Sequence, residues 1–374
     1  MTLSAPHMTT IEQMDVCNRD YWDQEIVKFK TVHPLNAYGW GKVRAIDGWT
    51  AICLMAKKDG VVTGAAMVLT KSIPLTPFSI MYIPRGPVFD LSDRETLKAL
   101  LVKIRSEARQ KNAIFLRIDP NTPENDISGK VDPFVNEGFI HLGNRWTDWN
   151  APKDVFRTDL TKGETEEQLF QLIHPKARSG VRKARKEGIA IRQAKTDDEV
   201  REFYRVFKEF AIGKGFLYRG FDYQQAIWEE FVKRKLGVLF LSGHDENIVG
   251  GMLCLTFGKI CLEMHRGVFS QYQKLRVNEA LVWEGIRWAK ENQCDWYCQR
   301  GIGSLALRKF KEKFNPDLVS LAGYYDLVYS PLLYAVFNKI EFGLIPKLLP
   351  GLKKIRKVYM ACLGRLGINR PQSR

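Results

Sequence analysis

Long apolar runs are missing from the sequence. No stretch of about 18 uncharged apolar residues occurs, so an ordinary membrane-spanning helix is excluded. The N-terminal residues contain neither the basic segment nor the apolar segment of an export signal. Because 45% of the residues are hydrophobic and 26% are charged, the chain is neither fibrous nor disordered. We expect a folded, cytoplasmic protein.

Metal-binding and nucleotide-binding signatures are missing as well. The seven cysteines include no pair at CxxC spacing, and Cys294 and Cys298 lie in a mostly apolar neighbourhood, interrupted by Asp295, with no second pair. HExxH, a Walker Gly-Lys-Ser and GxGxxG are absent, and no Ser/His/Asp order stands out. We therefore expect reduced thiols, no metal ion and no cofactor.

Negative charge is scarce relative to positive charge. The 374 residues, enough for two domains, include 57 Lys and Arg against 42 Asp and Glu, which gives a formal net charge of +15. An excess of this size favours a polyanionic partner, such as a nucleic acid, an anionic membrane or a phosphorylated substrate.

The first half alternates strands and helices in a pattern typical of α+β folds with a mainly antiparallel sheet. Asp59-Gly60 lies between two apolar runs and predicts a hairpin. A later helix can be capped by Ser92 or Asp93. The expected elements are strands at 51–57, 61–70, 78–83 and 113–118 and a helix with apolar positions at Leu97, Leu100, Leu101 and Ile104.

The second half repeats this order, which indicates a duplication of the fold pattern without residue identity. The turn at 244–247 predicts a second hairpin. The segment 120–165, rich in Pro, Asn, Asp and Gly, is the predicted linker. The expected elements are helices at 166–187, 197–212, 224–235 and 278–291 and strands at 189–193, 238–243, 248–257 and 260–264.

The sharpest basic cluster lies at 174–188. Arg178, Arg182 and Arg185 fall on one face of the predicted helix, which can bind phosphates or remain solvated. The letters from Arg185 to Ala190 also fit the R-x-x-G-x-A loop that binds the pyrophosphate of acyl-CoA. That loop runs from a strand into a helix, whereas this segment runs from a helix into a strand, so we interpret the match as accidental.

The C-terminal tail becomes apolar and basic. A helix is predicted from Gly351 to Gly364, with an apolar stripe and a basic face. Such a helix suits the surface of an anionic membrane, where it would give the protein peripheral contact. The alternative is that the stripe docks onto the first domain and the lysines face solvent.

Several sequence blocks occur in a fixed order between about residues 33 and 335. They are Asn36 to Arg44 with Trp49, Tyr82 to Val88, Leu116 to Pro120, Arg178 to Gly188, Leu305 to Phe314, and Tyr325-Asp326. Together these blocks resemble those of the Fem family, the non-ribosomal peptidyltransferases that build peptidoglycan cross-bridges. The first block is similar to Gln-Ser-x-x-Trp-Gly-x-x-Lys, and the fifth to Phe-Lys-x-x-Phe.

The resemblance implies a fold and a reaction. The fold would be α+β, with two N-acetyltransferase-like (GNAT) domains whose mainly antiparallel sheets are flanked by helices, and without a coiled-coil arm. The first, acceptor-binding domain would comprise 1–153 and 323–374, and the second 154–322. The donor would be aminoacyl-tRNA and the acceptor a muramyl pentapeptide, lipid-linked or UDP-linked, whose amine attacks the aminoacyl ester.

The resemblance also implies roles for individual residues. Lys311, beside Phe310, would lie near the tRNA 3′ end and the developing oxyanion, while Arg44, Arg219 and Tyr223 would hold the acceptor's phosphates. The implied set is catalytic Lys311, Phe310 and Asp119, substrate-binding Arg44, Arg219, Tyr223 and Trp40, and tRNA-binding Arg178, Arg182 and Arg185. Aminolysis of an activated ester needs mainly positioning and oxyanion stabilisation, which a lysine can supply.

Structural roles remain as alternatives for these residues. Arg44 could be a strand-edge surface charge, Arg219 a loop charge and Lys311 an ordinary exposed lysine. Asp119, a weak base in the first interpretation, could instead cap its own turn.

The sequence departs from the family pattern in ways that concern the acceptor. Asn36-Ala37 replaces Gln-Ser, Arg44 replaces lysine, and no aspartate precedes Gly301. Two other functions therefore remain as alternatives: an acyl-CoA-dependent N-acyltransferase for a sugar or lipid amine, and an RNA-binding or membrane-binding module without activity. The amino acid transferred and the oligomeric state are left open.

Overall fold

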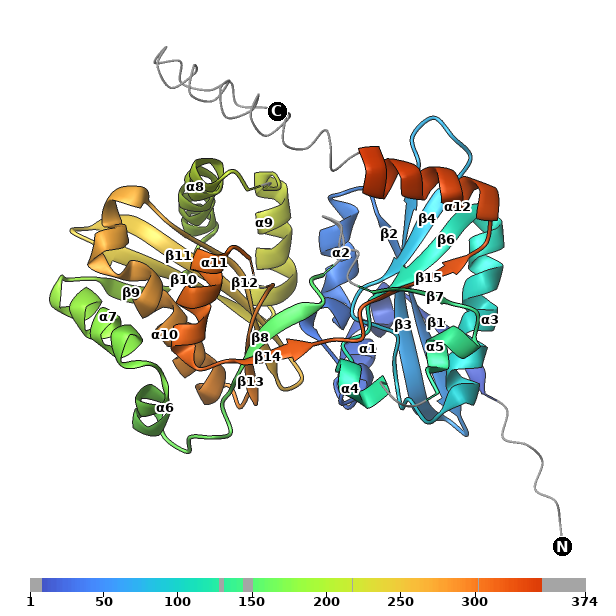
Figure 1. Cartoon of the computed structure of the whole chain (residues 1–374), viewed down its shortest axis with the longest axis horizontal. Coiled ribbons are helices and arrows are strands. Elements are labelled where there is room, and N and C mark those ends of the chain that lie inside the picture. Colours follow the sequence, from blue (N-terminus) through green and yellow to red (C-terminus); the bar gives the residue numbers. More distant parts are fainter. Residues whose placement is uncertain (1–8, 128–130, 144–150, 217, 302, 345–374) are drawn as a thin grey trace, which may run out of the picture.

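In the computed structural model, two mixed sheets lie side by side and carry helices (Figure 1). The structure describes residues 9–127, 131–143, 151–216, 218–301 and 303–344, so the predicted tail helix lies outside the described residues. In the described ranges, no helix combines the length and the apolar composition needed to cross a membrane.

The first sheet has eight strands in the order β1-β2-β3-β4-β6-β15-β7, with β5 paired to β3. Only β4 and β6 are parallel, so the sheet is mainly antiparallel, as predicted. The strands are β1 (Thr10–Met14), β2 (Thr50–Lys58), β3 (Val61–Ser72), β4 (Ser79–Ile83), β5 (Val88–Phe89), β6 (Ala113–Ile118), β7 (Ile140–Gly143) and β15 (Tyr324–Val328).

The second sheet has seven strands in the order β14-β8-β13-β12-β11-β10-β9. Here β12 and β13 form the parallel pair. The strands are β8 (Asp154–Asp159), β9 (Ala190–Gln193), β10 (Gly237–His244), β11 (Asn247–Phe257), β12 (Ile260–Val268), β13 (Trp296–Gln299) and β14 (Asp317–Ser320).

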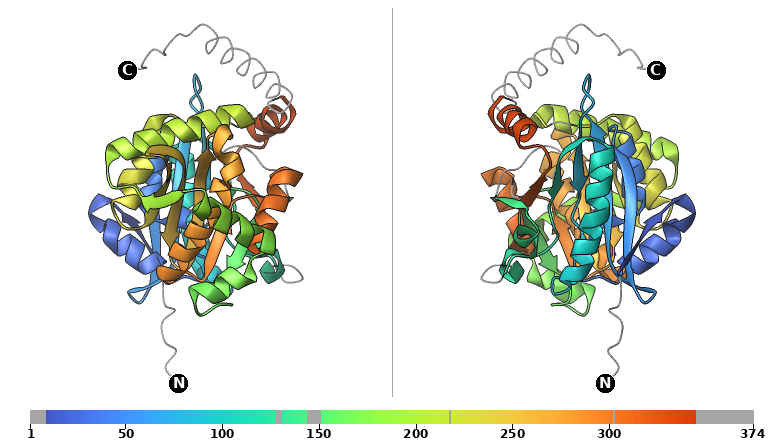
Figure 2. Two further views of the ribbon diagram at one scale, coloured as in Figure 1. Left: turned by 90° about the vertical axis from the view of Figure 1, so that its left-hand side faces the viewer. Right: turned by 90° about the vertical axis from the view of Figure 1, so that its right-hand side faces the viewer.

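The predicted duplication of the pattern is confirmed. In each sheet a hairpin leads to a third strand, a long helix and a strand parallel to the third: β2-β3-β4-α3-β6 corresponds to β10-β11-β12-α10-β13. A parallel pair needs such a crossover, which α3 (Arg94–Gln110) and α10 (Val277–Glu291) provide. The right-hand view of Figure 2 shows α3 lying across the outer face of the first sheet.

Further helices complete both halves. In the first half they are α1 (Arg19–Ile26), α2 (Gly39–Ala45), α4 (Glu124–Ile127), α5 (Pro133–Asn136) and α12 (Pro331–Asn338), with single-turn helices at 16–18 and 34–36 and a π-helix at 339–344. In the second half they are α6 (Glu166–Leu172), α7 (Pro175–Lys186), α8 (Asp197–Lys214), α9 (Phe221–Ile227) and α11 (Leu305–Lys311), with a π-helix at 228–232 and 3-10 helices at 270–275 and 312–314.

The predicted single helix at 166–187 is wrong, because the chain breaks there into α6 and α7. Pro175 has no N–H to continue the first helix, and the ring Nδ1 of His174 caps the second by accepting a hydrogen bond from the backbone N–H of Lys176 at 3.0 Å. The predicted helix at 224–235 is shifted: it begins earlier, as α9, and ends in the π-helix.

The predicted linker at 120–165 is right only in part, because the passage between the sheets takes up a short stretch of it. It contains β7 of the first sheet and β8, an inner strand of the second. The chain crosses between the sheets there and again between β14 and β15, and the two crossings lie side by side. The backbone N–H of Leu321 donates to the carbonyl of Lys153 at 3.1 Å, and the Tyr324 hydroxyl to that of Ala151 at 2.8 Å.

One hydrophobic cluster joins the two halves. It contains Trp22 and Trp40 from the first two helices and Phe231, Leu253 and Leu262 from the second half, all buried. Separate clusters fill the space between α3 and the first sheet and between the second sheet and its helices α7 and α10. The surfaces between the sheets are therefore fixed by a shared core, which positions the groups described below.

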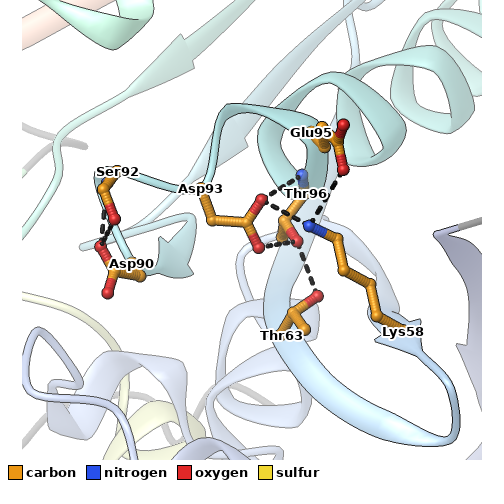
Figure 3. Close-up of polar contacts among 7 residues, drawn as sticks. All are labelled: Lys58, Thr63, Asp90, Ser92, Asp93, Glu95 and Thr96. Atoms are coloured by element: carbon orange, nitrogen blue, oxygen red, sulfur yellow. Dashed lines mark hydrogen bonds and ion pairs between the residues drawn. The ribbon is translucent and has the colours of Figure 1, made fainter. Parts of the chain in front are cut away.

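A polar network fixes the start of α3 (Figure 3). Asp93 Oδ1 accepts a hydrogen bond from the backbone N–H of Thr96 at 3.1 Å, which makes Asp93 the cap. Asp93 also accepts from the Thr96 hydroxyl at 2.7 Å and from Lys58 Nζ at 2.8 Å. Ser92, the other predicted cap, bonds to Asp90 instead.

We predict that Asp93→Ala lowers the free energy of unfolding by about 1–2 kcal/mol, because it removes the cap and leaves an N–H of the first turn unpaired. Ser92→Ala is the control and should change the stability by less. Urea denaturation of both variants measures the difference. Equal stabilities of the two variants would show that Asp93 does not fix this helix.

Candidate active site

The helix α2 presents Trp40 and Arg44 on its buried side, with 3% and 4% of their surfaces exposed. Glycine allows this close packing. A Cβ atom on Gly41 would lie 2.8 Å from the Cβ of Ala51 in β2, so only glycine lets the helix approach the strand this closely. The alternative for Arg44, a surface charge at a strand edge, is wrong.

Two residues of the second half join this cluster. Arg219 Nε donates to Asp47 Oδ2 at 2.6 Å, and the Arg219 guanidinium carbon lies 4.6 Å from the centre of the Tyr223 ring. Tyr223, in α9, meets the Trp40 ring edge-on with centroids 6.4 Å apart. The structure thus brings Trp40, Arg44, Arg219 and Tyr223 together from both halves.

This cluster has more donors than acceptors. Within the described part of the chain, Arg44 Nε and Trp40 Nε1 are buried and have no hydrogen-bond partner. Asp47 is the carboxylate beside both arginines, and it lies 3.9 Å from Arg44 Nε. Burial, followed by the charge of Arg219, lowers the pKa of Arg44, although Tyr223 and Asp47 oppose this. A bound anion would supply the missing acceptors.

Lys311 ends α11, whose first turn Ser304 caps. Its Nζ donates to the carbonyl oxygens of Arg300 at 2.6 Å and Gly301 at 2.8 Å, and only 4% of the residue is exposed. The alternative of an ordinary exposed lysine is therefore wrong. Burial lowers the pKa of Lys311 to about 8, although the charge of Glu263 partly opposes this.

An ammonium group has three N–H donors, so Lys311 keeps one beyond the two main-chain bonds. Its neighbour Phe310 lies beneath two cations, with the Arg266 guanidinium carbon 5.0 Å and Lys313 Nζ 5.4 Å from the ring centre. The end of α11 therefore combines a partly desolvated lysine with an aromatic ring in a positively charged environment.

The site lies where both parallel strand pairs separate. Pairing of β4 with β6 ends at Ile83 and Ile118, and pairing of β12 with β13 ends at Glu263 and Gln299. Asp119 and Arg300 follow directly after two of these strands. Carboxyl ends of parallel strands are common binding positions, because the diverging strands leave space between them.

The Asp119 carboxylate joins three separate segments of the chain. Its carboxylate accepts hydrogen bonds from the Tyr82 hydroxyl at 2.7 Å, the Arg85 backbone N–H at 2.6 Å and the Ala151 backbone N–H at 3.1 Å. Within the described residues its hydrogen bonds come from these other segments, so the alternative that Asp119 caps its own turn is wrong. Burial raises its pKa, although Arg85 and these hydrogen bonds partly oppose the shift.

Sequence reasoning did not single out Arg85 or Arg300. Arg85 stands inside the block from Tyr82 to Val88, and Arg300 directly precedes the Gly301 turn. These positions were the signals in the sequence that could have pointed to both arginines. Burial and the charges of Arg85 and Arg219 lower the pKa of Arg300, while Tyr223 and Tyr82 raise it. Arg300 thus lies between the cluster around Arg44 and the loop that contains Arg85.

The basic face of α7 is only partly available. Arg178 donates to the carbonyl of Gln171 at 2.5 Å and holds α6 against α7. Arg182 and Arg185 are exposed, although the Arg182 guanidinium also lies 5.4 Å from the Phe170 ring centre. The backbone N–H of His174 donates to the carbonyl of Lys313 at 2.8 Å, so the start of this helix adjoins the segment after Lys311.

The direction of the chain after α7 agrees with the sequence prediction. The helix ends at Lys186, Gly188 has a positive φ of 79°, and β9 follows. A helix that runs into a strand presents its carbonyl end there, which does not suit a pyrophosphate. Among the described residues, no group of three or more His, Cys, Asp or Glu could hold a metal ion.

Comparison with known proteins shows relatives across most of the chain. A model of the FemAB family matches residues 23–243 and 239–341. A lipid II:glycine glycyltransferase of Staphylococcus aureus (strain USA300) is 27% identical over 278 residues, 72% of this chain and 63% of that protein. Another, of Staphylococcus haemolyticus (strain JCSC1435), is 28% identical over 241 residues, 62% of this chain and 55% of that protein. The matched region thus spans less than two thirds of these relatives.

Solved structures share the fold. The crystal structure of FemX superposes with a TM-score of 0.79 at 19% identity, covering 87% of this chain and 99% of that one. A tandem GNAT protein from the clavulanic acid biosynthesis pathway gives a TM-score of 0.54 at 12% identity, covering 87% of this chain and 99% of that one. The expected fold of two GNAT-like units is confirmed, and this chain belongs to the FemAB family.

Proposed function

We propose that this protein transfers an amino acid from aminoacyl-tRNA to the peptide amine of a peptidoglycan precursor, a lipid-linked or UDP-linked muramyl pentapeptide. Membership of the FemAB family and similarity to proteins named lipid II:glycine glycyltransferase support this substrate class. The observation that carries the proposal is Lys311, a buried lysine that donates to the carbonyl oxygens of Arg300 and Gly301 and keeps a third N–H donor.

The reaction needs little more than this arrangement provides. The acceptor amine attacks the ester carbonyl, a C–N bond forms, and the carbonyl oxygen becomes negatively charged. The C–O bond to the tRNA then breaks, and the proton from the amine goes to the leaving 3′ oxygen. Lys311 donates its remaining N–H to the developing oxyanion, which stabilises the transition state more than the ground state.

The two substrates enter from different sides in this proposal. The acceptor's diphosphate lies between Arg44 and Arg219, where its oxygens satisfy the unpaired Arg44 Nε. The donor tRNA follows the exposed arginines of α7, Arg182 and Arg185, toward the adjoining end of α11. Asp119 acts as a positioning residue, because hydrogen bonds from within the protein occupy its oxygens.

A transfer assay tests the proposal. The full chain is incubated with charged total tRNA and a UDP-linked muramyl pentapeptide, and mass spectrometry should show the precursor with one added aminoacyl group. A parallel reaction replaces the charged tRNA with acetyl-CoA, which tests the alternative N-acyltransferase. Acetylation without aminoacylation would reject the proposed donor, and an unchanged precursor with every charged tRNA would reject the transferase.

We predict that Lys311→Ala lowers kcat by about 10²–10³-fold while the KM for the acceptor stays nearly unchanged, because the lost group acts mainly in the transition state. Lys309→Ala, an exposed lysine on the same helix, is the matched control and should keep wild-type kinetics. Steady-state kinetics separate the two constants. An unchanged kcat with a raised KM would reject this role.

The pH profile gives a second test of Lys311. With a pKa of about 8, the side chain is a cation below that pH and neutral above it. If the cation stabilises the oxyanion, kcat falls as the pH rises through about 8, and Lys311→Arg, which stays charged, loses this descending limb. If neutral Lys311 acted instead as a general base, kcat would rise through the same pH range.

We predict that Arg44→Ala and Arg219→Ala each weaken binding of a UDP-linked precursor by about 1.5–3 kcal/mol, the value of a hydrogen bond to a charged group. Lys42→Ala is the matched control, an exposed cation on the same helix as Arg44. Isothermal titration calorimetry measures the three affinities. Wild-type affinity in both arginine variants would remove the diphosphate from this position.

Peripheral contact with an anionic membrane is part of the proposal. In α12 and the π-helix after it, Leu332, Val336 and Ile340 lie four residues apart and are 77%, 50% and 47% exposed. An apolar stripe on a protein of net charge +15 suits an anionic lipid surface, where a lipid-linked acceptor lies.

We predict that Leu332→Glu with Val336→Glu reduces sedimentation with anionic liposomes several-fold but leaves transfer to a UDP-linked acceptor intact. Val102→Glu, at an exposed apolar position on α3, is the control. Wild-type sedimentation of the double variant would reject contact through α12. Deletion of residues 351–374, followed by the same liposome sedimentation, tests whether the predicted tail helix binds the membrane.

A further inference from the structure

The carboxylate of Glu263 lies where β12 and β13 separate. Glu263 and Gln299 form the last pair that joins these two strands. The next residue of β12, Met264, is an extra residue opposite the step from Leu253 to Cys254 in β11. This β-bulge bends β12 away from its neighbour at the candidate site. The side chain of Glu263, which is 11% exposed, therefore stands at the opening between the strands.

Three side chains of the same two strands hold this carboxylate. The Tyr297 hydroxyl donates to Glu263 Oε2 at 2.9 Å, and Gln299 Nε2 donates to the same oxygen at 3.2 Å. Arg266 Nε donates to Oε1 at 3.0 Å. Because both oxygens are bonded, the carboxylate has a fixed direction and does not turn toward solvent.

Glu263 carries a negative charge. Burial raises its pKa, but the charges of Arg266 and Lys311 and the hydrogen bonds from Gln299 and Arg266 lower it, and the net change is downward. Tyr297 remains protonated, since burial and the charge of Glu263 raise its pKa well above the usual value. At neutral pH, Glu263 is therefore a buried anion held by hydrogen-bond donors.

Arg266 connects Glu263 to Phe310. Its guanidinium forms the ion pair with Glu263 and lies over the Phe310 ring, with its carbon 5.0 Å from the ring centre. It also donates to the side-chain oxygen of Asn278 in α10. The guanidinium is thus held from two sides, and the ring beneath it is placed relative to the Glu263 carboxylate.

Gln299 connects Glu263 to the loop that holds Lys311. The two residues after Gln299 are Arg300 and Gly301, whose carbonyl oxygens accept the hydrogen bonds of Lys311 Nζ at 2.6 and 2.8 Å. A side-chain bond from Gln299 to Glu263 therefore fixes the strand end from which this loop begins. Glu263 is linked in this way to both residues at the end of α11.

Glu263 also acts on Lys311 by its charge. Its negative charge raises the pKa of Lys311, whereas burial and the charges of Arg266 and Arg300 lower it. The described hydrogen bonds of Lys311 Nζ go to main-chain oxygens, so the attraction to Glu263 acts through space. Without this carboxylate, burial and both guanidiniums would act together against the ammonium form.

The other carboxylates around the end of α11 face other cations. Glu279 of α10 lies 3.3 Å from Arg276 Nη1 and 3.7 Å from Lys313 Nζ. Glu312, which follows Lys311 in the chain, is exposed and forms an ion pair along the helix surface. Exposed charges are screened by water, so Glu312 has far less effect on a buried neighbour than Glu263.

We propose that Glu263 is a positioning residue for the transfer and that its buried carboxylate serves as the counter-ion of Lys311. Its hydrogen bonds also fix Phe310, through Arg266, relative to Lys311. This inference rests on the proposed function of Lys311. The carboxylate stabilises the ammonium form, which is the form that donates to the developing oxyanion. Glu263 acts through Lys311 and does not itself contact the reacting atoms.

NMR spectroscopy measures the protonation of Lys311 without any transfer. The full chain is labelled with isotope-enriched lysine, and the Lys311 signal is identified by its loss in Lys311→Arg. We expect a titration midpoint of about 8 in the wild type and a midpoint lower by about one pH unit or more in Glu263→Gln. Glu312→Gln, the matched control, should keep the wild-type midpoint. An unchanged midpoint in Glu263→Gln would overturn the proposal.

The pH profile of transfer is the functional readout. In Glu263→Gln, the descending limb of kcat should move to lower pH together with the NMR midpoint, while the KM for the acceptor changes little. Glu263→Asp keeps the charge on a shorter side chain and should retain the limb near the wild-type pH, with a lower plateau. A merely structural residue would lower kcat at every pH, and a limb that stays in place in Glu263→Gln would reject the counter-ion.

A second comparison applies if Glu263→Gln does not fold, because that variant leaves the 10% exposed Arg266 side chain without its carboxylate. The double variant Glu263→Gln with Arg266→Gln removes both charges and is compared with Arg266→Gln alone. The two differ only in the carboxylate, so the Lys311 midpoint should be lower in the double variant by about one pH unit or more. Equal midpoints would overturn the proposal.

Failure of this inference and failure of the proposed function give different results. Absent transfer with a Lys311 midpoint that depends on Glu263 would reject the proposed function and retain the counter-ion. Transfer with a midpoint that does not depend on Glu263 would reject the counter-ion alone.

Discussion

The carboxylate of Asp119 is the interaction on which the space between the two sheets depends. It joins the end of β4 through Tyr82, the loop of Arg85, and the chain crossing at Ala151. Because the acceptor atoms of one side chain hold three separate segments, the two crossings and the strained Arg85 backbone are fixed together. Replacing Asp119 would release all of them.

Asp119 does not neutralise the cations that surround this space. Arg44, Arg85 and Arg300 come from different elements, and in the described residues the carboxylates of Asp47 and Asp119 lie beside them. At the protein surface, water stabilises an excess of positive charge. In the buried space between the two sheets, the same excess raises the free energy of the folded protein. The same constraint explains the lowered pKa of Lys311, since burial disfavours its charged form. Substrates that carry diphosphate, carboxylate and RNA phosphate groups would supply negative charge to balance these buried cations.

Local sequence signals predicted the local structure, and long-range packing decided the rest. Asp59-Gly60 specified its hairpin, and Asp93 its helix cap, because both act on neighbouring backbone groups. Pro175 broke a helix whose apolar pattern continued across it. For the site, the resemblance singled out Lys311 and Arg44 as candidates. Their burial, and the meeting of Arg85, Arg157 and Arg300, follow from contacts between distant segments, which no local pattern encodes.

The central claim is that aminoacyl transfer takes place in the space between the two sheets. A crystal structure of the full chain with a bound UDP-linked muramyl pentapeptide tests it most directly. We predict that the diphosphate lies within hydrogen-bond distance of Arg44 and Arg219 and that the acceptor amine lies on the same side of the site as Lys311, with room for the donor ester between them. A precursor bound outside this space, with Arg44 Nε still unpaired and Lys311 remote from the amine, would contradict it.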